Sequence, residues 1–120
     1  MRLRLPLVAL LVTAVVGGAL IARAGSSGPT AFRTPGAGAA CRHAGAALVC
    51  SSLGSTGSVA LGEAAGARMV TTLPWWDAST PVVHRWRSGR IACRLRGEAI
   101  VCQNGTAAIR VDASGFAIRR

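Results

Sequence analysis

The sequence predicts a small all-β domain made of two related antiparallel hairpin-based halves, preceded by a signal peptide. Three observations lead to this prediction. A cysteine-bounded segment occurs twice, short β-like runs alternate with turn residues, and no 12-residue segment after the first 24 residues has the 3.6-residue apolar period of a helix. We therefore expect one domain over residues 31–120, with its halves at residues 31–72 and 82–120.

The first 24 residues have the parts of a signal peptide. Two arginines in residues 1–4 precede an uncharged, mostly apolar run over residues 5–21, and Ala22-Arg23-Ala24 has the small-x-small form of a signal peptidase site. We expect cleavage here and a secreted or extracytoplasmic product. An uncleaved leader would instead anchor the protein in the membrane, since the apolar run is near the lower limit for a bilayer span. Residues 25–30, rich in Gly, Ser and Pro, are expected to form a flexible linker.

The four cysteines bound the two copies of the repeated segment. Residues 41–50, CRHAGAALVC, and residues 93–102, CRLRGEAIVC, are identical at six of ten positions and are offset by 52 residues. An even number of cysteines in an exported chain predicts two disulfides. Because Gly45 and Gly97 each lead a two-residue loop, both segments are typical of a type II′ hairpin.

Alternation along such a hairpin determines which cysteines lie opposite each other. It places Cys41 opposite Cys50 and Cys93 opposite Cys102, in the closer, non-hydrogen-bonded pairs, and these pairings are favoured. Bridges between the repeats, such as Cys41–Cys102, stay open because spacing alone does not determine connectivity. Zinc sites usually have two to four residues between paired cysteines, so eight intervening residues disfavour a metal.

Further strands are expected along the rest of the domain. Residues 58–61 and 68–73 flank a glycine-containing loop and predict a third hairpin, and residues 81–86, 107–111 and 116–118 are the other strand candidates. Only 22 positions after residue 24 carry Val, Leu, Ile, Phe, Met or Trp. The core is therefore expected to be thin, with the disulfides supplementing it.

The charge balance predicts a surface that attracts polyanions. All 14 basic residues are arginine, and removal of the leader leaves 11 of them against 4 acidic residues, a net charge of +7. Alternation along the second hairpin places its apolar residues on one face and Arg90, Arg94 and Arg96 on the other. Arg85 and Arg87, beside Trp86, are expected to enlarge this patch.

Adjacent tryptophans, Trp75 and Trp76, allow two interpretations. On an extended strand they point to opposite faces, so that one is free to stack on a sugar ring or to lie at a membrane interface. In the other interpretation, which the scarcity of aromatic residues favours, the pair closes the two ends of the thin core.

These features predict an exported binding or structural module of the cell envelope or medium. The arginines, with Trp75 and Trp76 as stacking residues, would bind phosphate or carboxylate groups of an anionic envelope polymer or a membrane surface. Nucleic acid is not the expected partner in vivo. The plain alternative is a solvated sheet face, and the rival function is a protein-interaction or inhibitor module that uses a Trp-containing loop or an exposed strand edge.

Candidate catalytic residues are few. His43 shares a face with Cys41 and is expected to be a partly buried structural residue, and a Ser79–His84–Asp77 triad lacks any nucleophile motif. Metal motifs, phosphate-cradling glycine loops and haem attachment motifs are absent from the sequence. We expect no enzymatic activity, no cofactor and no metal.

Several short motifs occur in a fixed order along the domain: Phe32-Arg-Thr-Pro35, Cys41, Cys102-Gln-Asn104, Gly115-Phe116 and Arg119-Arg120. This pattern resembles that of small exported actinobacterial domains of unknown function, over most of residues 31–120. The chain departs from it at residues 36–40, which lack the usual Gly-Asn-Ile, and at Ala113, where Gly or His is common. The resemblance implies an exported, disulfide-stapled β domain and supplies no activity.

Overall fold

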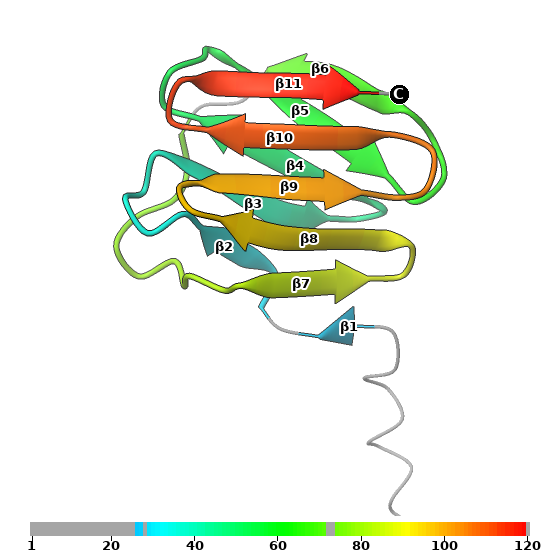
Figure 1. The fold of residues 1–120 in the computed structure, drawn as a ribbon, viewed down its shortest axis with the longest axis horizontal. Helices are drawn as coiled ribbons and strands as arrows, with labels where there is room; N and C mark the ends of the chain where they lie inside the picture. Colours follow the sequence, from blue (N-terminus) through cyan, green and yellow to red (C-terminus); the bar gives the residue numbers. More distant parts are fainter. Residues whose placement is uncertain (1–25, 28, 72–73, 120) are drawn as a thin grey trace, which may run out of the picture.

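The computed structural model describes residues 26–27, 29–71 and 74–119. In these ranges the chain forms two antiparallel sheets that are stacked as layers (Figure 1). The all-β prediction is therefore confirmed. The described ranges contain no helix that could cross a membrane. The expected leader, residues 1–24, lies outside them.

The first sheet is a meander of five strands, each hydrogen-bonded to the next along the chain. Its strands are β2 (Ala31–Arg33), β3 (Ala39–Ala44), β4 (Ala47–Ser52), β5 (Gly57–Gly62) and β6 (Ala67–Thr71). The third hairpin expected from the sequence is the β5–β6 pair. Val59 and Leu61 of β5 are fully buried, because alternation turns them towards the other sheet.

The second sheet repeats this meander and gains one short strand at its edge. Its five main strands are β7 (Arg85–Ser88), β8 (Ile91–Arg96), β9 (Ala99–Gln103), β10 (Ala108–Asp112) and β11 (Gly115–Arg119). The added strand, β1 (Ser26–Ser27), pairs with β7 on its free side (Figure 1). A six-stranded sheet therefore faces a five-stranded one.

The shared strand order shows the internal duplication directly. β8 begins and ends 52 residues after β3, and each of the two strands forms a hairpin with the next strand. The two halves thus have the same sequence of five antiparallel strands. This confirms the prediction of two related hairpin-based halves.

The repeated hairpins have the geometry that their sequences predict. Gly45 and Gly97 both have a φ of +63°, and no other residue of these two loops has a positive φ, as a type II′ turn requires. Cys41 pairs with Cys50 and Cys93 with Cys102 in the ladders. Both pairs form disulfides, with Cα atoms 4.0 Å apart, and the cross-repeat alternative is not adopted.

The core lies between the sheets, and the two disulfides are at its centre. The sulfur atoms of Cys41, Cys50 and Cys102 lie within 4.8 Å of one another, so the bridges pack against each other across the layers. Beside them, the rings of Phe32 and Trp86 are 5.4 Å apart. These two aromatic residues occupy equivalent positions, each opposite the first cysteine of its repeat.

Polar contacts at the ends of the sandwich join the two halves. Asn104 is buried, and its Nδ2 donates to the carbonyl oxygens of Gly62 and Ala65 at 2.7 and 2.8 Å. Ser52, which precedes it by 52 positions, donates its hydroxyl to the carbonyl of Asp112 at 2.5 Å. Each half therefore donates a side-chain hydrogen bond to main-chain carbonyl groups of the other, from the end of β4 and from the residue that follows β9.

The structure differs from the expectations in two places: where the strand expected at residues 81–86 begins, and in the linker expected at residues 25–30. The strand expected at residues 81–86 begins only at Arg85, and Pro81, which has no N–H to donate, instead accepts a hydrogen bond from the Arg33 N–H. Part of the expected linker is attached to the domain: β1 pairs with β7, and the carbonyl of Pro29 accepts from the Trp86 indole at 2.6 Å. Residues 26, 27 and 29, which composition assigns to a linker, thus form hydrogen bonds with the folded domain.

Candidate functional site

The candidate site is the outer surface of the second sheet, which we call the arginine face. Since Cys93, Trp86 and Ile109 point into the core, alternation turns their strand neighbours outwards. The outward positions of β7, β8, β10 and β11 carry six exposed arginines: Arg85, Arg87, Arg94, Arg96, Arg110 and Arg119. One sheet surface therefore holds most of the arginines that the structure describes.

Strand register arranges these arginines around a floor of small side chains. Arg85 is paired with Arg94, Arg94 with Val101, and Val101 with Arg110, so they form one row across the sheet. A parallel row runs from Arg87 through Ala92, Gln103 and Ala108 to Arg119. The second row thus has an arginine at each end and shorter side chains between them, while the first row has arginines on both sides of Val101.

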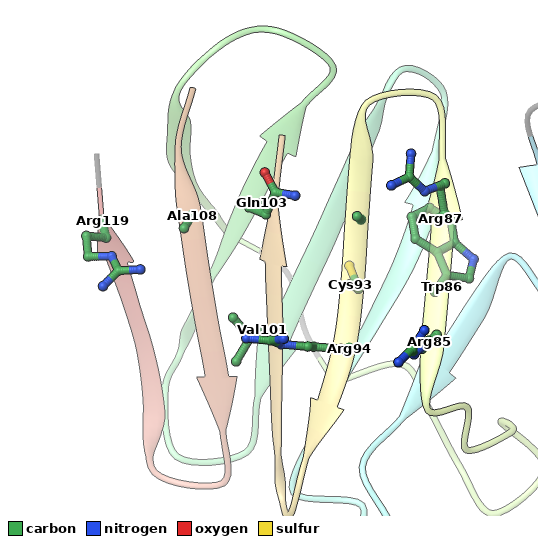
Figure 2. Close-up of a pocket in the computed structure, with 10 residues that line it drawn as sticks. Arg85, Trp86, Arg87, Cys93, Arg94, Val101, Gln103, Ala108 and Arg119 are labelled. Carbon is green, nitrogen blue, oxygen red and sulfur yellow. The ribbon is translucent and has the colours of Figure 1, made fainter. Parts of the chain in front are cut away.

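The low floor forms a hollow in the arginine face (Figure 2). Its volume is about 600 Å³, and Arg85, Arg87, Arg94 and Arg119 line it together with Val101. Figure 2 shows the Arg94 side chain extending from β8 across the surface towards Val101, with Arg119 on the opposite side of the hollow. A second hollow of about 420 Å³ continues past Arg94 towards Arg96 and Arg110.

Three of the four acidic side chains form no ion pair with this surface in the described ranges. Within the described ranges the ion-pair geometry occurs once, between Arg110 and Asp112 at 3.4 Å. Glu98 instead accepts from the Gly36 N–H and Glu63 from the Arg90 N–H, at 2.8 and 2.7 Å. The acidic groups are thus used to fix loops.

Asp112 and Asp77 fix turns in the same way. Asp77 accepts hydrogen bonds from the hydroxyl and the N–H of Ser79. The hydroxyl and N–H of Ser114 donate to Asp112, and these bonds, with a smaller contribution from Arg110, hold the pKa of Asp112 below its ordinary value. Both carboxylates therefore stay ionised for structural reasons.

The structure brings together only part of the binding set proposed from the sequence. Arg85, Arg87, Arg94 and Arg96 lie on one face as expected from alternation. Arg90 does not join them, because it lies in the β7–β8 loop, where its side chain reaches Gly105.

Sequence reasoning missed Arg110, Arg119 and Gln103, which complete the face. Arg110 stands between the buried Ile109 and Val111, and this period-two pattern could have revealed its outward direction. Arg119 extends β11 by one position beyond the expected strand, residues 116–118. Their place beside Arg94 depends on the order of strands in the sheet, which periodicity does not give.

Trp75 and Trp76 lie away from the arginine face. Arg42, which alternation turns to the outside of the first sheet, has its guanidinium 5.1 Å from the centroid of the Trp75 ring. Trp76 contacts Trp75 edge to face and donates its indole N–H to the carbonyl of Ala37 at 2.9 Å. The interpretation that the pair closes the ends of the core is wrong, because both rings pack on the outer surface of the first sheet.

The two histidines differ in their surroundings. His43 is half-buried, and its ring packs edge to face on Trp86 with centroids 5.4 Å apart. His84 is exposed, and within the described part of the chain no hydrogen bond joins its imidazole to Ser79 or Asp77. The three clustered sulfur atoms are in disulfides.

Comparison with protein-family models, curated proteins and solved structures finds no match for this chain. The resemblance to exported actinobacterial domains therefore stays a prediction, while the small disulfide-bonded β domain that it implies is present in the structure.

Proposed function

We propose that the protein is a non-catalytic binding module outside the cytoplasm, and that its arginine face binds an anionic polymer. The observation that carries this proposal is the placement of six arginines around two adjoining hollows, with acidic pairing limited to Arg110 among the described residues. Arginine donates paired hydrogen bonds to phosphate and carboxylate groups, which suits such a ligand. The two disulfides support a location in an oxidising compartment.

The shape of the site favours a chain-like ligand over a membrane surface. Proteins that insert into a membrane interface do so with large apolar side chains. The exposed large apolar residues of the described ranges are Leu53, Met69 and Val82, and none of them lies on the arginine face. The hollow instead runs across the strands, with arginines along both sides.

Binding would also relieve a cost within the free protein. Arg85 and Arg94 stand opposite each other, and like charges at opposed positions destabilise a sheet. The Arg94 side chain extends towards Val101 (Figure 2), so an anionic polymer that lies across β8 contacts both guanidinium groups and offsets their repulsion. We therefore expect affinity to fall steeply as salt screens the charges.

Polyphosphate of defined length is a suitable first probe. It is titrated into the purified, disulfide-bonded protein, and isothermal titration calorimetry gives Kd. The variant R94Q/R119Q removes one arginine from each side of the hollow. The control R68Q/R90Q removes the same charge from β6 and from the β7–β8 loop, neither of which lines the hollow. We expect the face variant to raise Kd at least about tenfold and the control less than about threefold.

Vesicles with anionic headgroups serve as the second ligand. Polyphosphate binding with weak vesicle binding is the expected result. Equal losses of affinity in the two double variants, or no polyphosphate binding at low salt, would contradict the proposal.

A further inference from the structure

The two sheets can be compared position by position, because both ladders are anchored on equivalent cysteine pairs. Arg33 lies opposite Ala40 as Arg87 lies opposite Ala92. Arg42 follows Cys41 as Arg94 follows Cys93, and each of the two lies opposite a valine on the next strand. Arg33 and Arg42 are therefore the first-sheet equivalents of Arg87 and Arg94.

In the first sheet these two arginines already have a ligand, which is a segment of the chain itself. The Arg33 Nε donates to the carbonyl of Thr80 at 2.8 Å, and the Arg42 guanidinium stacks over Trp75. Both partners belong to the irregular connection between β6 and β7. The Arg33 N–H also donates to the carbonyl of Pro81 at 2.9 Å.

Burial shows that this outer surface is covered. Ala40, Ser51 and Ser58 alternate to the outside of the first sheet, yet their exposed fractions are only 0–3%. A sheet surface with this arginine pair thus accommodates a polypeptide segment that offers a main-chain carbonyl and an aromatic ring.

In the second sheet the equivalent surface is open. Arg87 and Arg94 are exposed, line the hollow and have no ionic or hydrogen-bonding partner within the described ranges. The positions between them, Ala92 and Val101, match Ala40 and Val49 in the first sheet. The floor on which a segment lies is therefore of similar height in both sheets.

The sheets differ in charge at the surrounding positions. Ladder pairing aligns four further arginines with apolar residues: Arg85 with Ala31, Arg96 with Ala44, Arg110 with Ala60, and Arg119 with Val70. The open surface thus carries arginine at four positions where the covered surface carries alanine or valine. A segment that binds the open surface therefore needs several acidic side chains, whereas the connection over the first sheet has one, Asp77.

We infer that the arginine face binds an irregular acidic segment of a partner polypeptide. Its aromatic ring lies over Arg94, a main-chain carbonyl accepts from Arg87, and its carboxylates lie beside Arg85, Arg110 and Arg119. This inference rests on the proposed function and specifies the anionic polymer as an acidic polypeptide that contains an aromatic residue.

Three synthetic peptides of equal length test this inference by calorimetry with the disulfide-bonded protein. The first is residues 74–81, Pro-Trp-Trp-Asp-Ala-Ser-Thr-Pro, flanked on both sides by aspartates. The second has leucines in place of the tryptophans, and the third has asparagines in place of all aspartates. Each of the two replacements is expected to raise Kd about fivefold or more. Polyphosphate is the fourth ligand.

The R94Q variant supplies the positional test, and R68Q is its charge-matched control. We expect R94Q to abolish the difference between the tryptophan and leucine peptides, and R68Q to preserve it. Equal affinity of these two peptides for the unmodified protein would overturn the inference, as would an undiminished difference in R94Q. In either case, the proposed function would still be supported if the protein bound polyphosphate and R94Q weakened that binding. Failure of all four ligands to bind would overturn both.

Discussion

Arg85 and Arg94 lie directly opposite each other on β7 and β8, although neither has an acidic partner in the described ranges. Opposed like charges cost a sheet a few tenths of a kcal/mol to about 1 kcal/mol. We therefore expect Arg94→Gln to raise the free energy of unfolding by about 0.5 kcal/mol at low salt while it weakens anion binding. Arg68→Gln, opposite Ala60, should change stability little. Urea unfolding at low and high salt measures both free energies of unfolding. A gain in stability of Arg94→Gln that persists at high salt would contradict the explanation by charge repulsion.

The two disulfides are expected to stabilise the protein to a similar degree. Both close a loop with a sequence separation of 9, and their cysteines are at most 5% exposed. Replacing either pair with alanines should lower the free energy of unfolding by about 2–5 kcal/mol, through lost chain constraint and lost packing. Urea unfolding of the two double variants gives the values. A loss below about 1 kcal/mol for either pair would show that the core does not need its bridge.

Gly54 lies where the first half contacts the β10–β11 turn of the second, and a larger residue does not fit there without a shift of the backbone. A Cβ on Gly54 would overlap the carbonyl of Ala113 and the backbone of Ser114 in the β10–β11 turn. Gly54→Ala should therefore cost about 1–3 kcal/mol of unfolding free energy. Gly66→Ala is the matched control, because a Cβ there meets nothing within 4 Å, and the change should be neutral or slightly stabilising. Thermal unfolding compares the two variants, and equal midpoints would rule out this contact.

Asp112 gives stability a defined pH dependence. Its pKa is lowered chiefly by the Ser114 hydroxyl and N–H, so the folded state favours the ionised carboxylate. This contribution is complete above the ordinary Asp pKa of about 4 and is lost as the pH falls through the lower pKa of the folded state. Ser114→Ala should raise the pKa of Asp112 towards its ordinary value, as followed by NMR titration of the carboxyl carbon. Ser79→Ala, which acts on Asp77, should leave it unchanged.

Local sequence determines the hairpins and the register of their cysteines. Gly45 and Gly97 fix two-residue turns, and alternation from those turns brings Cys41 to Cys50 and Cys93 to Cys102 without any long-range information. The repeat itself indicated two equivalent halves, and the strand order confirms them.

Long-range contacts account for what the sequence did not reveal. Trp75 packs on Arg42 and Trp76 on Ala37, so the position of the tryptophans depends on the course of the connection over the first sheet. Arg119 joins the arginine face only because β10 places β11 at its far edge. Such relationships arise from strand order, which hydrophobic periodicity does not specify.

The most direct test of the central claim is to map bound polyphosphate on the protein by NMR with ¹⁵N-labelled material. The account predicts that the largest amide shift changes occur at the floor of the hollow, at Ala92, Val101, Gln103 and Ala108, and that they fade as salt is added. Changes centred on the outer surface of the first sheet, around Arg42 and Trp75, would contradict it.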